Sequence, residues 1–106
     1  MLLDRLVQEL KRGNLTVAVM SRLTEEEHYG YSLLQELSVR GLDINQDTLY
    51  PMLRRLEEQN LLESRWDVDS SRPRRYYRLS SSGKEIFQAL VDAWLSMEDT
   101  IRSIIR

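Results

Sequence analysis

The chain has 106 residues, 42% of them hydrophobic and 30% charged, and this composition predicts one small folded domain and argues against a disordered chain. No apolar run approaches the roughly 20 residues that a membrane-spanning helix needs, and the charged N-terminal segment does not resemble a signal peptide. With no cysteine and one histidine, His28, we expect no disulfide, no metal site and no cofactor, in a cytoplasmic setting.

The first predicted element is helical. Apolar residues recur at helical spacing from Leu2 to Leu23. Gly13 and Asn14 interrupt this pattern, either as a break between two helices or as a glycine tolerated within one helix. A capping box formed by Thr24 and Glu27 then predicts the start of a short amphipathic helix over residues 29–40, which ends near a glycine at position 41.

A second short helix is predicted over residues 47–59, because Leu49, Leu53 and Leu56 share one face. Pro51 leaves two possibilities for where this helix begins. If Thr48 is the capping residue, the proline falls in the first turn, where its missing N–H has no consequence. If the helix begins earlier, it must bend at the proline.

Two runs with strand character follow. Residues 62–68 alternate between apolar and polar side chains, residues 74–80 are β-prone, and the turn composition of residues 69–73 joins them as a hairpin. Alternation sends Tyr77 and Leu79 to the core with Arg75 on their face, and it sends Arg74, Tyr76 and Arg78 to the other face. A capping box of Ser82 and Glu85 opens a final helix that runs to the C-terminus.

This order of elements predicts a winged helix-turn-helix, mainly α with a small β-hairpin, extended by N-terminal and C-terminal dimerisation helices. We expect residues 1–80 to form the DNA-binding domain and residues 81–106 to form the dimerisation helix. In such a fold the 47–59 helix enters the major groove. Its side chains off the leucine face have types that pair with base edges and phosphates: Gln46, Thr48, Tyr50, Arg54 and Arg55. The alternative is an ordinary helical domain, since many contain two short helices.

Positive charge is concentrated on the hairpin. Although the net charge is −2, residues 61–80 contain five arginines and three acids, whereas acids exceed bases elsewhere. We expect Arg72, Arg74 and Tyr76 to reach phosphates or the minor groove. The alternative is a solvated hairpin whose arginines offset nearby acids.

The stretches HYGYSLLQEL, DTLYPMLRRLEEQNLLESRW and RPRRYYRLSSSGKEIF resemble the PadR family of bacterial transcriptional regulators, over about residues 11–94. The resemblance is to the short subfamily, whose C-terminal region is a single helix. It implies a dimeric repressor that a ligand or a stress releases from DNA. It also implies that the recognition helix begins before the proline.

The resemblance assigns roles to particular residues, and on its basis we also expect Tyr29, Tyr31 and Arg75 to contact DNA. Tyr29 and Tyr31 match the paired tyrosines that open the support helix. Thr48, Leu49, Tyr50 and Pro51 match the TLYP segment of the recognition helix, and Arg74, Arg75, Tyr76 and Tyr77 match the basic and aromatic wing strand. This chain has Asp47 where the family usually has a glycine, and an acid there faces phosphates unless it caps the helix.

The terminal helices carry more apolar surface than one small domain covers. In the last helix, Phe87, Val91, Trp94, Ile101 and Ile105 follow a spacing close to a heptad, and Leu90, Met97 and Ile104 broaden the stripe. Leu2, Leu3, Leu6 and Leu10 form a second stripe. We expect these stripes to pair across a two-fold axis in a homodimer that binds a palindromic operator. The alternative is that the terminal helices cover each other within one chain.

The resemblance also implies a ligand site, because members of the short subfamily bind planar aromatic compounds between tryptophans at the dimer centre. Trp94 occupies the matching place, Glu98 one turn later can attract a cation, and Asn14 and Val17 can line the same space. The alternative is that Trp94 is interface core. Trp66, on the first hairpin strand, is expected to be an ordinary packing residue.

The sequence leaves one alternative function open and argues against another. A winged-helix protein-interaction module that does not bind DNA would fit the acidic net charge and Asp47. An enzyme is not expected, because the sequence contains no paired carboxylates, no nucleophile beside a histidine and no phosphate-binding loop, so no catalytic residue is assigned.

Overall fold

The computed structural model describes residues 1–69 and 71–106 of the chain. Within these residues the elements are α1 (Leu2–Arg12), α2 (Leu15–Ser21), β1 (His28–Tyr29), α3 (Gly30–Val39), α4 (Gln46–Glu58), β2 (Leu62–Asp67), β3 (Arg74–Leu79) and α5 (Ser81–Ile105). The chain is therefore mainly helical with a small antiparallel sheet, as the sequence predicts. The predicted turn over residues 69–73 includes Ser70, which lies outside the described residues. We call β2, β3 and the described residues between them the wing.

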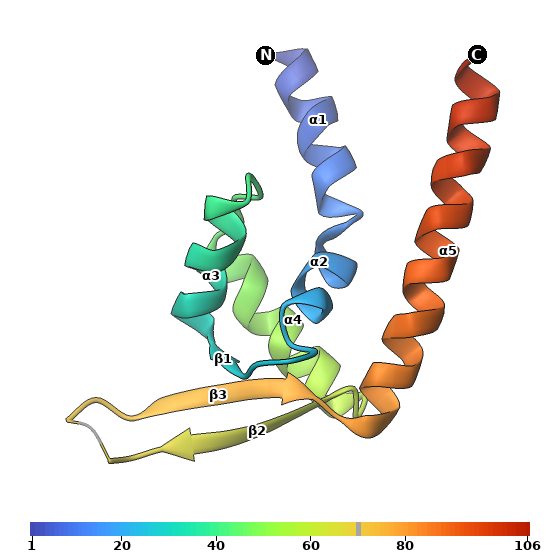
Figure 1. Cartoon of the computed structure of the whole chain (residues 1–106). Helices are drawn as coiled ribbons and strands as arrows, with labels where there is room; N and C mark the ends of the chain where they lie inside the picture. The colour runs from blue at the N-terminus through green and yellow to red at the C-terminus, as the bar shows by residue number, and fades with distance from the viewer. Residues whose placement is uncertain (70) are drawn as a thin grey trace.

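The N-terminal pattern resolves into two helices. α1 ends at Arg12, and Asn14 is the N-terminal capping residue of α2. The break lets the two helices have different surroundings: α2 buries three apolar side chains, whereas α1 buries none. As Figure 1 shows, α1 and α5 project from the same side of the body, so that both termini lie at one end of the molecule.

The predicted capping box at Thr24 and Glu27 is wrong. α3 begins at Gly30 after Tyr29, and Thr24 instead donates its hydroxyl hydrogen to the backbone oxygen of Ser21 at 3.1 Å. The segment between α2 and α3 does not enter the helix because its last two residues pair with β3. The end of α3 is as predicted: Gly41 has a φ of +95°, which glycine adopts without the steric cost that a side chain would add.

α4 begins earlier than the leucine pattern alone suggests. Its N-terminal capping residue is Asn45, whose Oδ1 accepts a hydrogen bond from the backbone N–H of Thr48 at 2.9 Å. The alternative with Thr48 as the capping residue is therefore wrong, and the earlier start implied by the family resemblance is confirmed. Pro51 lies inside the helix, where the backbone oxygen of Asp47 receives no hydrogen bond from it.

The sheet contains a strand, β1, that the sequence pattern does not predict. Its order is β1-β3-β2, and β1 pairs His28 with Tyr77 and Tyr29 with Tyr76. A strand of two residues carries no alternation pattern, so only the position of β3 beside it reveals the pairing. β2 and β3 form the predicted hairpin, and Tyr77 and Leu79 are buried as the alternation of β3 predicts.

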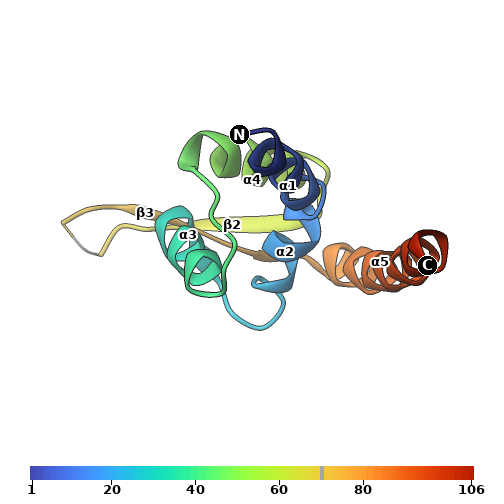
Figure 2. The ribbon, with the colours of Figure 1, turned by 90° about the horizontal axis from the view of Figure 1, so that it is seen from above.

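The core lies between the helices and one face of the sheet. Its members come from α2 to α4, the segment after α2, and the wing: Leu15, Val19, Met20, Leu23, Leu33, Leu37, Leu49, Met52, Leu53, Leu56, Leu62, Tyr77 and Leu79. Seen from above in Figure 2, the wing and α5 extend from opposite sides of this body. The body thus holds α4 and the wing in a defined relation, while α1 and α5 remain largely outside it.

α5 begins with a different cap from the predicted one. Ser80, rather than Ser82, is the N-terminal capping residue, and its Oγ accepts a hydrogen bond from the backbone N–H of Gly83 at 2.9 Å. The hydroxyl of Ser82 instead donates to the backbone oxygen of Asn60 at 3.0 Å. A Cβ at Gly83 would overlap the backbone oxygen of Leu61, so the glycine allows α5 to start close against the end of α4.

Candidate nucleic-acid interface

The outward face of α4 is available for contact with a partner. The helix buries Leu49, Met52, Leu53 and Leu56, so at 100° per residue the opposite face is the one that meets solvent. Exposed residues of the helix are Gln46, Asp47, Thr48, Pro51, Arg54, Arg55 and Glu58. Asp47 does not cap the helix, since Asn45 does, and its carboxylate lies in the first turn, where the helix dipole favours a negative charge.

Tyr50 connects α4 to the start of α3. Its ring is half-buried and lies against Gly30, where an added Cβ would overlap the ring. Tyr31, the next residue of α3, is 56% exposed, and its hydroxyl oxygen accepts a hydrogen bond from Nε2 of Gln35 at 3.2 Å. The two tyrosines that were predicted as a pair therefore have different surroundings: Tyr31 faces solvent, whereas Tyr29 packs on the wing.

Aromatic rings and guanidinium groups alternate along the base of the wing. The Arg74 guanidinium lies 4.5 Å from the ring centroid of Tyr29, which meets Tyr76 edge-on at 5.4 Å. On the far side of Tyr76, the guanidinium of Arg65 lies 4.9 Å from the ring centroid. Arg65 also pairs with Glu27, and its hydrogen bond lowers the pKa of the Glu27 carboxyl. Tyr76, expected to reach DNA, is thus half-buried between Tyr29 and Arg65.

Arg75 joins the wing to the end of α4. Its Nη2 lies 2.7 Å from Oε1 of Glu57, and its Nε donates to the hydroxyl oxygen of Ser64 at 3.0 Å. Ser64 in turn donates to Glu57, so three side chains from α4, β2 and β3 form one polar cluster. Arg75 was predicted to contact DNA, and the structure places its guanidinium in this cluster. The cluster ties the position of the wing to that of α4.

The structure separates the arginines into two groups. Arg65, Arg75 and Arg78 of the wing each pair with a glutamate, the last with Glu63 at 3.2 Å. By contrast, Arg54, Arg55 and Arg74 have no ion pair within residues 1–69 and 71–106. Sequence counting treats all of these charges alike, because it does not show which glutamate each arginine meets.

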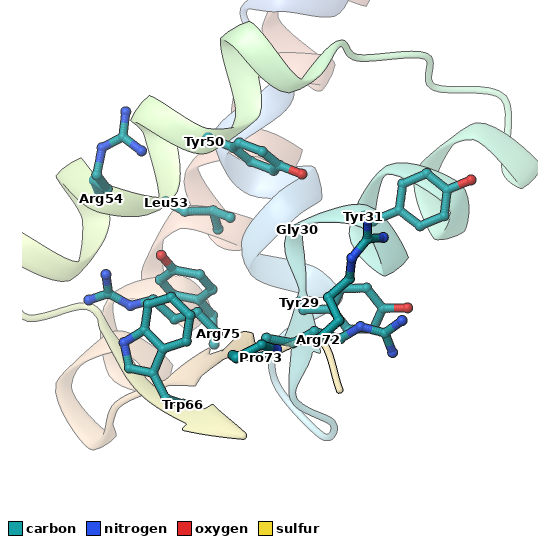
Figure 3. A pocket seen from close by; sticks show the side chains of 12 residues that line it. Tyr29, Gly30, Tyr31, Tyr50, Leu53, Arg54, Trp66, Arg72, Pro73 and Arg75 are labelled. Atoms are coloured by element: carbon teal, nitrogen blue, oxygen red, sulfur yellow. The ribbon is translucent and has the colours of Figure 1, made fainter. Parts of the chain in front are cut away.

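A cleft lies between α3, α4 and the wing. Its volume is about 670 Å³. Figure 3 shows Tyr50 and Arg54 on one side, Trp66 and Pro73 on the other, and Gly30 between them. The residues that line it are Tyr29, Gly30, Tyr31, Tyr50, Leu53, Arg54, Trp66, Arg72, Pro73, Arg74, Arg75 and Tyr77. Several are arginines or carry aromatic rings, and none of the carboxylates that the structure describes is among them.

Trp66 does not have the predicted environment. An ordinary packing residue was expected from the sequence, but the side chain is 60% exposed at the edge of the cleft. The Arg75 guanidinium lies 5.9 Å from its ring centroid. The alternation of β2 correctly places Trp66 on one face of the strand, but that face extends beyond the core along the wing.

The predicted interface residues of the terminal helices are mostly exposed. These are Leu2, Leu3, Leu6 and Leu10 of α1, and Trp94, Met97, Ile101, Ile104 and Ile105 of α5. Phe87 and Leu90 pack against the core, and Val91 is half-buried. The alternative in which the terminal helices cover each other within one chain is therefore wrong.

Two of the four predicted ligand residues meet in the structure. Nε1 of Trp94 donates a hydrogen bond to Oδ1 of Asn14 at 2.5 Å, which links α5 to the break between α1 and α2. Val17 is half-buried on α2. Glu98 pairs with Arg102 one turn further along α5, at 3.4 Å.

Among the described residues, no helix combines the length and the hydrophobicity that crossing a membrane requires. The same residues contain no group of three or more His, Cys, Asp or Glu side chains placed to hold a metal ion.

Comparisons with known proteins agree with this architecture. Residues 19–89 match the model of the transcriptional regulator PadR-like family. A PadR family transcriptional regulator from Eggerthella lenta has 38% identity and a TM-score of 0.94 over 99% of this chain and 93% of its own. A PadR-like transcription factor from Bacteroides fragilis has 31% identity and a TM-score of 0.77, over 95% of this chain and 99% of its own. Transcriptional regulator Rv3488 of Mycobacterium tuberculosis is 32% identical over 99 residues, which are 93% of this chain and 90% of that protein.

Proposed function

The chain belongs to the PadR-like family of transcriptional regulators, and from this we propose that it is a cytoplasmic, homodimeric repressor that a small molecule releases from its operator. Membership makes it a winged-helix regulator of transcription that acts on DNA. The repressor role, the dimer and the ligand are the parts that the proposal adds.

The observation that carries the DNA-binding mode is the position of the arginines without ion pairs. Arg54 and Arg74 lie on the cleft between α4 and the wing, and Arg55 lies on the exposed side of α4. Since a guanidinium already paired with a glutamate gains less from a phosphate, we assign the phosphate contacts to these three residues. Gln46 and Thr48 are exposed in the first turn of α4, and we assign to them the reading of base edges in the major groove.

The exposed apolar faces of α1 and α5 support the homodimer. A soluble monomer rarely exposes a contiguous apolar stripe of this length, and pairing with a second copy would bury it. In a two-fold dimer the two α4 helices would enter successive major grooves about 34 Å apart, which requires a palindromic operator. The dimer is thus the form in which the proposed repressor meets DNA.

Release by a small molecule is proposed at the Trp94 site, near the expected dimer axis. The hydrogen bond from Trp94 to Asn14 supports it, because a ligand that displaces this bond would act on both the break after α1 and the middle of α5. A planar aromatic cation suits the tryptophan face, and its charge would compete with Arg102 for Glu98. Such a ligand can release DNA only if it binds one spacing of the α4 helices more tightly than another.

DNA binding is tested with a fluorescent duplex from upstream of the chain's own gene, titrated by anisotropy at two or more salt concentrations. We expect tight binding, with an association constant whose logarithm falls linearly with the logarithm of the salt concentration. The Arg54→Ala/Arg74→Ala variant should bind more weakly. The magnitude of the slope of this salt dependence should fall by about 2, since each lost phosphate contact reduces it by about 0.9. Arg78→Ala is the matched control, because it removes an exposed wing charge that is already paired with Glu63.

Repression and its relief by a ligand are tested separately from DNA binding. Repression requires that the protein lower transcript yield from that promoter in a purified transcription reaction, and that a planar aromatic cation restore the yield. A protein that ignores DNA at low salt would instead be the protein-interaction module, and the DNA-binding assignment would be wrong.

A further inference from the structure

The cleft between α3, α4 and the wing has the size of a small-molecule site. Its volume of about 670 Å³ falls within the range of roughly 300–1,000 Å³ that such sites occupy. Its walls come from three elements, with Arg54 on α4, Tyr31 on α3 and Trp66 on the wing (Figure 3). We propose that this cleft binds a purine nucleotide, and that the nucleotide and operator DNA exclude each other.

The charge of the cleft selects an anion. Arg54 and Arg74 line it without an ion pair in the described part of the chain, whereas the charge of Arg75 is offset by Glu57. The carboxylates of the described residues all lie outside its lining, so a bound anion is not opposed by a lining acid. A guanidinium group presents two parallel N–H donors that match the oxygens of a phosphate. These features favour a phosphate group bound to Arg54 of α4.

The aromatic side chains point to a ligand with a free ring face. Tyr31 and Trp66 are 56% and 60% exposed, and both line the cleft. Bases within duplex DNA are stacked on one another and present only their edges in the grooves, so the duplex cannot use these ring faces for stacking. A free nucleotide presents both faces of its base, and a base stacks on any aromatic ring. A two-ring purine covers the indole of Trp66 better than a pyrimidine does.

Exclusion follows from a shared residue. The proposed function assigns Arg54 to the phosphates of DNA, and the same guanidinium group would hold the phosphate of the nucleotide. The exclusion therefore rests on the proposed function, whereas binding of the nucleotide does not. The nucleotide would act at the DNA-binding face itself, away from Trp94.

Tryptophan fluorescence of the full chain tests the site, because the sequence has only two tryptophans. Trp94→Phe leaves Trp66 as the reporter, and Trp66→Phe leaves Trp94. We expect guanosine 5′-monophosphate, at constant ionic strength, to quench the first variant and not the second. Guanosine lacks the phosphate and ribose 5-phosphate lacks the base, so each should bind at least about tenfold more weakly.

Calorimetric titration needs no tryptophan replacement and covers the case in which a tryptophan variant does not fold. Wild-type protein should bind guanosine 5′-monophosphate, and Arg54→Gln should weaken binding by about tenfold because a charge-assisted contact is lost. Arg78→Gln should bind as wild type does, since Arg78 is exposed and pairs with Glu63. Equal binding of ribose 5-phosphate and the nucleotide, quenching that follows Trp94, or an unaffected Arg54→Gln would overturn the site.

Competition is measured by displacement of labelled operator DNA by guanosine 5′-monophosphate. Loss of anisotropy at the concentrations that quench Trp66 supports exclusion, and a ternary complex with unchanged anisotropy overturns it. The two failures are distinct. Protein that binds the nucleotide but no DNA refutes the proposed function and leaves the site intact, whereas protein that binds DNA but no nucleotide refutes the site alone.

Discussion

Tyr50 of α4 packs so closely on Gly30 of α3 that a methyl group at Gly30 would overlap the tyrosine ring, with the added Cβ 2.9 Å from Cζ. The two helices therefore meet through a contact that a larger residue at position 30 would disturb, because the Tyr50 ring would have to shift. The same two residues line the cleft.

The first prediction concerns this contact. Gly30→Ala should weaken operator binding by about tenfold, because the Tyr50 ring must move and this shifts α4. The free energy of binding should become less favourable by roughly 1 kcal/mol or more. Anisotropy titration measures the affinity, and circular dichroism checks the fold. Gly13→Ala is the matched control, since its added Cβ would lie 3.8 Å from the nearest atoms, in ordinary contact. If both alanine variants bind DNA equally well, the Gly30 contact does not set the geometry of α4.

The second prediction concerns the start of α4. Asn45→Ala removes the side-chain oxygen that accepts the Thr48 N–H, and loss of such a cap costs about 1 kcal/mol. Thermal unfolding at fixed protein concentration should show a midpoint lower by about 4–8 °C. Asn45→Asp retains an acceptor and should stay close to wild type. A midpoint unchanged in Asn45→Ala would mean that solvent satisfies this N–H equally well.

The third prediction concerns the cluster that links the wing to α4. A double-mutant cycle with Glu57→Gln and Arg75→Gln should give a coupling of about 1 kcal/mol in urea unfolding, because the pair is partly buried and shares Ser64. The exposed pair of Glu63 and Arg78 provides the control cycle, with an expected coupling of less than about 0.5 kcal/mol. Equal couplings in the two cycles would show that burial of the first pair adds nothing.

The fourth prediction concerns acid stability. Hydrogen bonding from Arg65 holds the pKa of Glu27 below its ordinary value. A carboxyl whose pKa is lower in the folded state stabilises the fold above its unfolded pKa, and this contribution is lost as the pH falls through the folded pKa. Glu27→Gln should therefore be less stable than wild type at pH 7, and the difference should shrink below about pH 4.3. Urea unfolding at pH 7 and pH 3 measures both values.

Glu25→Gln is the control for that experiment. Glu25 is exposed and has no ion pair within the described residues. Its substitution should leave the pH dependence of unfolding as in wild type. A pH-independent effect of Glu27→Gln would contradict the role of ionisation.

The fifth prediction concerns the proposed dimer. Ile101→Glu places a charge on the apolar stripe of α5 and should convert the dimer to monomer in sedimentation velocity, because an unpaired buried charge is strongly unfavourable. Leu95→Glu is the matched control: the side chains are 50% and 48% exposed, but Leu95 lies off the stripe. The proposed dimer would be contradicted if the wild-type chain sediments as a monomer, or if the two variants sediment alike.

Several features of the fold were predictable from the sequence because they depend on local pattern. The periodicity of Leu49, Leu53 and Leu56 identified α4, and the alternation in β3 placed Tyr77 and Leu79 in the core. Gly41 marked the end of α3. Caps were less predictable, because Asn45 and Ser80 compete with nearby residues of similar type, and only the chain path shows which oxygen reaches an N–H.

The sequence by itself determined the order of the later helices and the two hairpin strands, the leucine face of α4, the inward positions of Tyr77 and Leu79, and the family resemblance, since each depends on spacing and residue type along the chain. Only the tertiary structure decided which charges are available. Arg74 and Arg75 are neighbours in sequence, yet one lies over Tyr29 without an ion pair in the described residues, and the other pairs with Glu57. The reason is physical: alternation sends consecutive strand residues to opposite faces, and the partner that each face meets comes from a distant part of the chain.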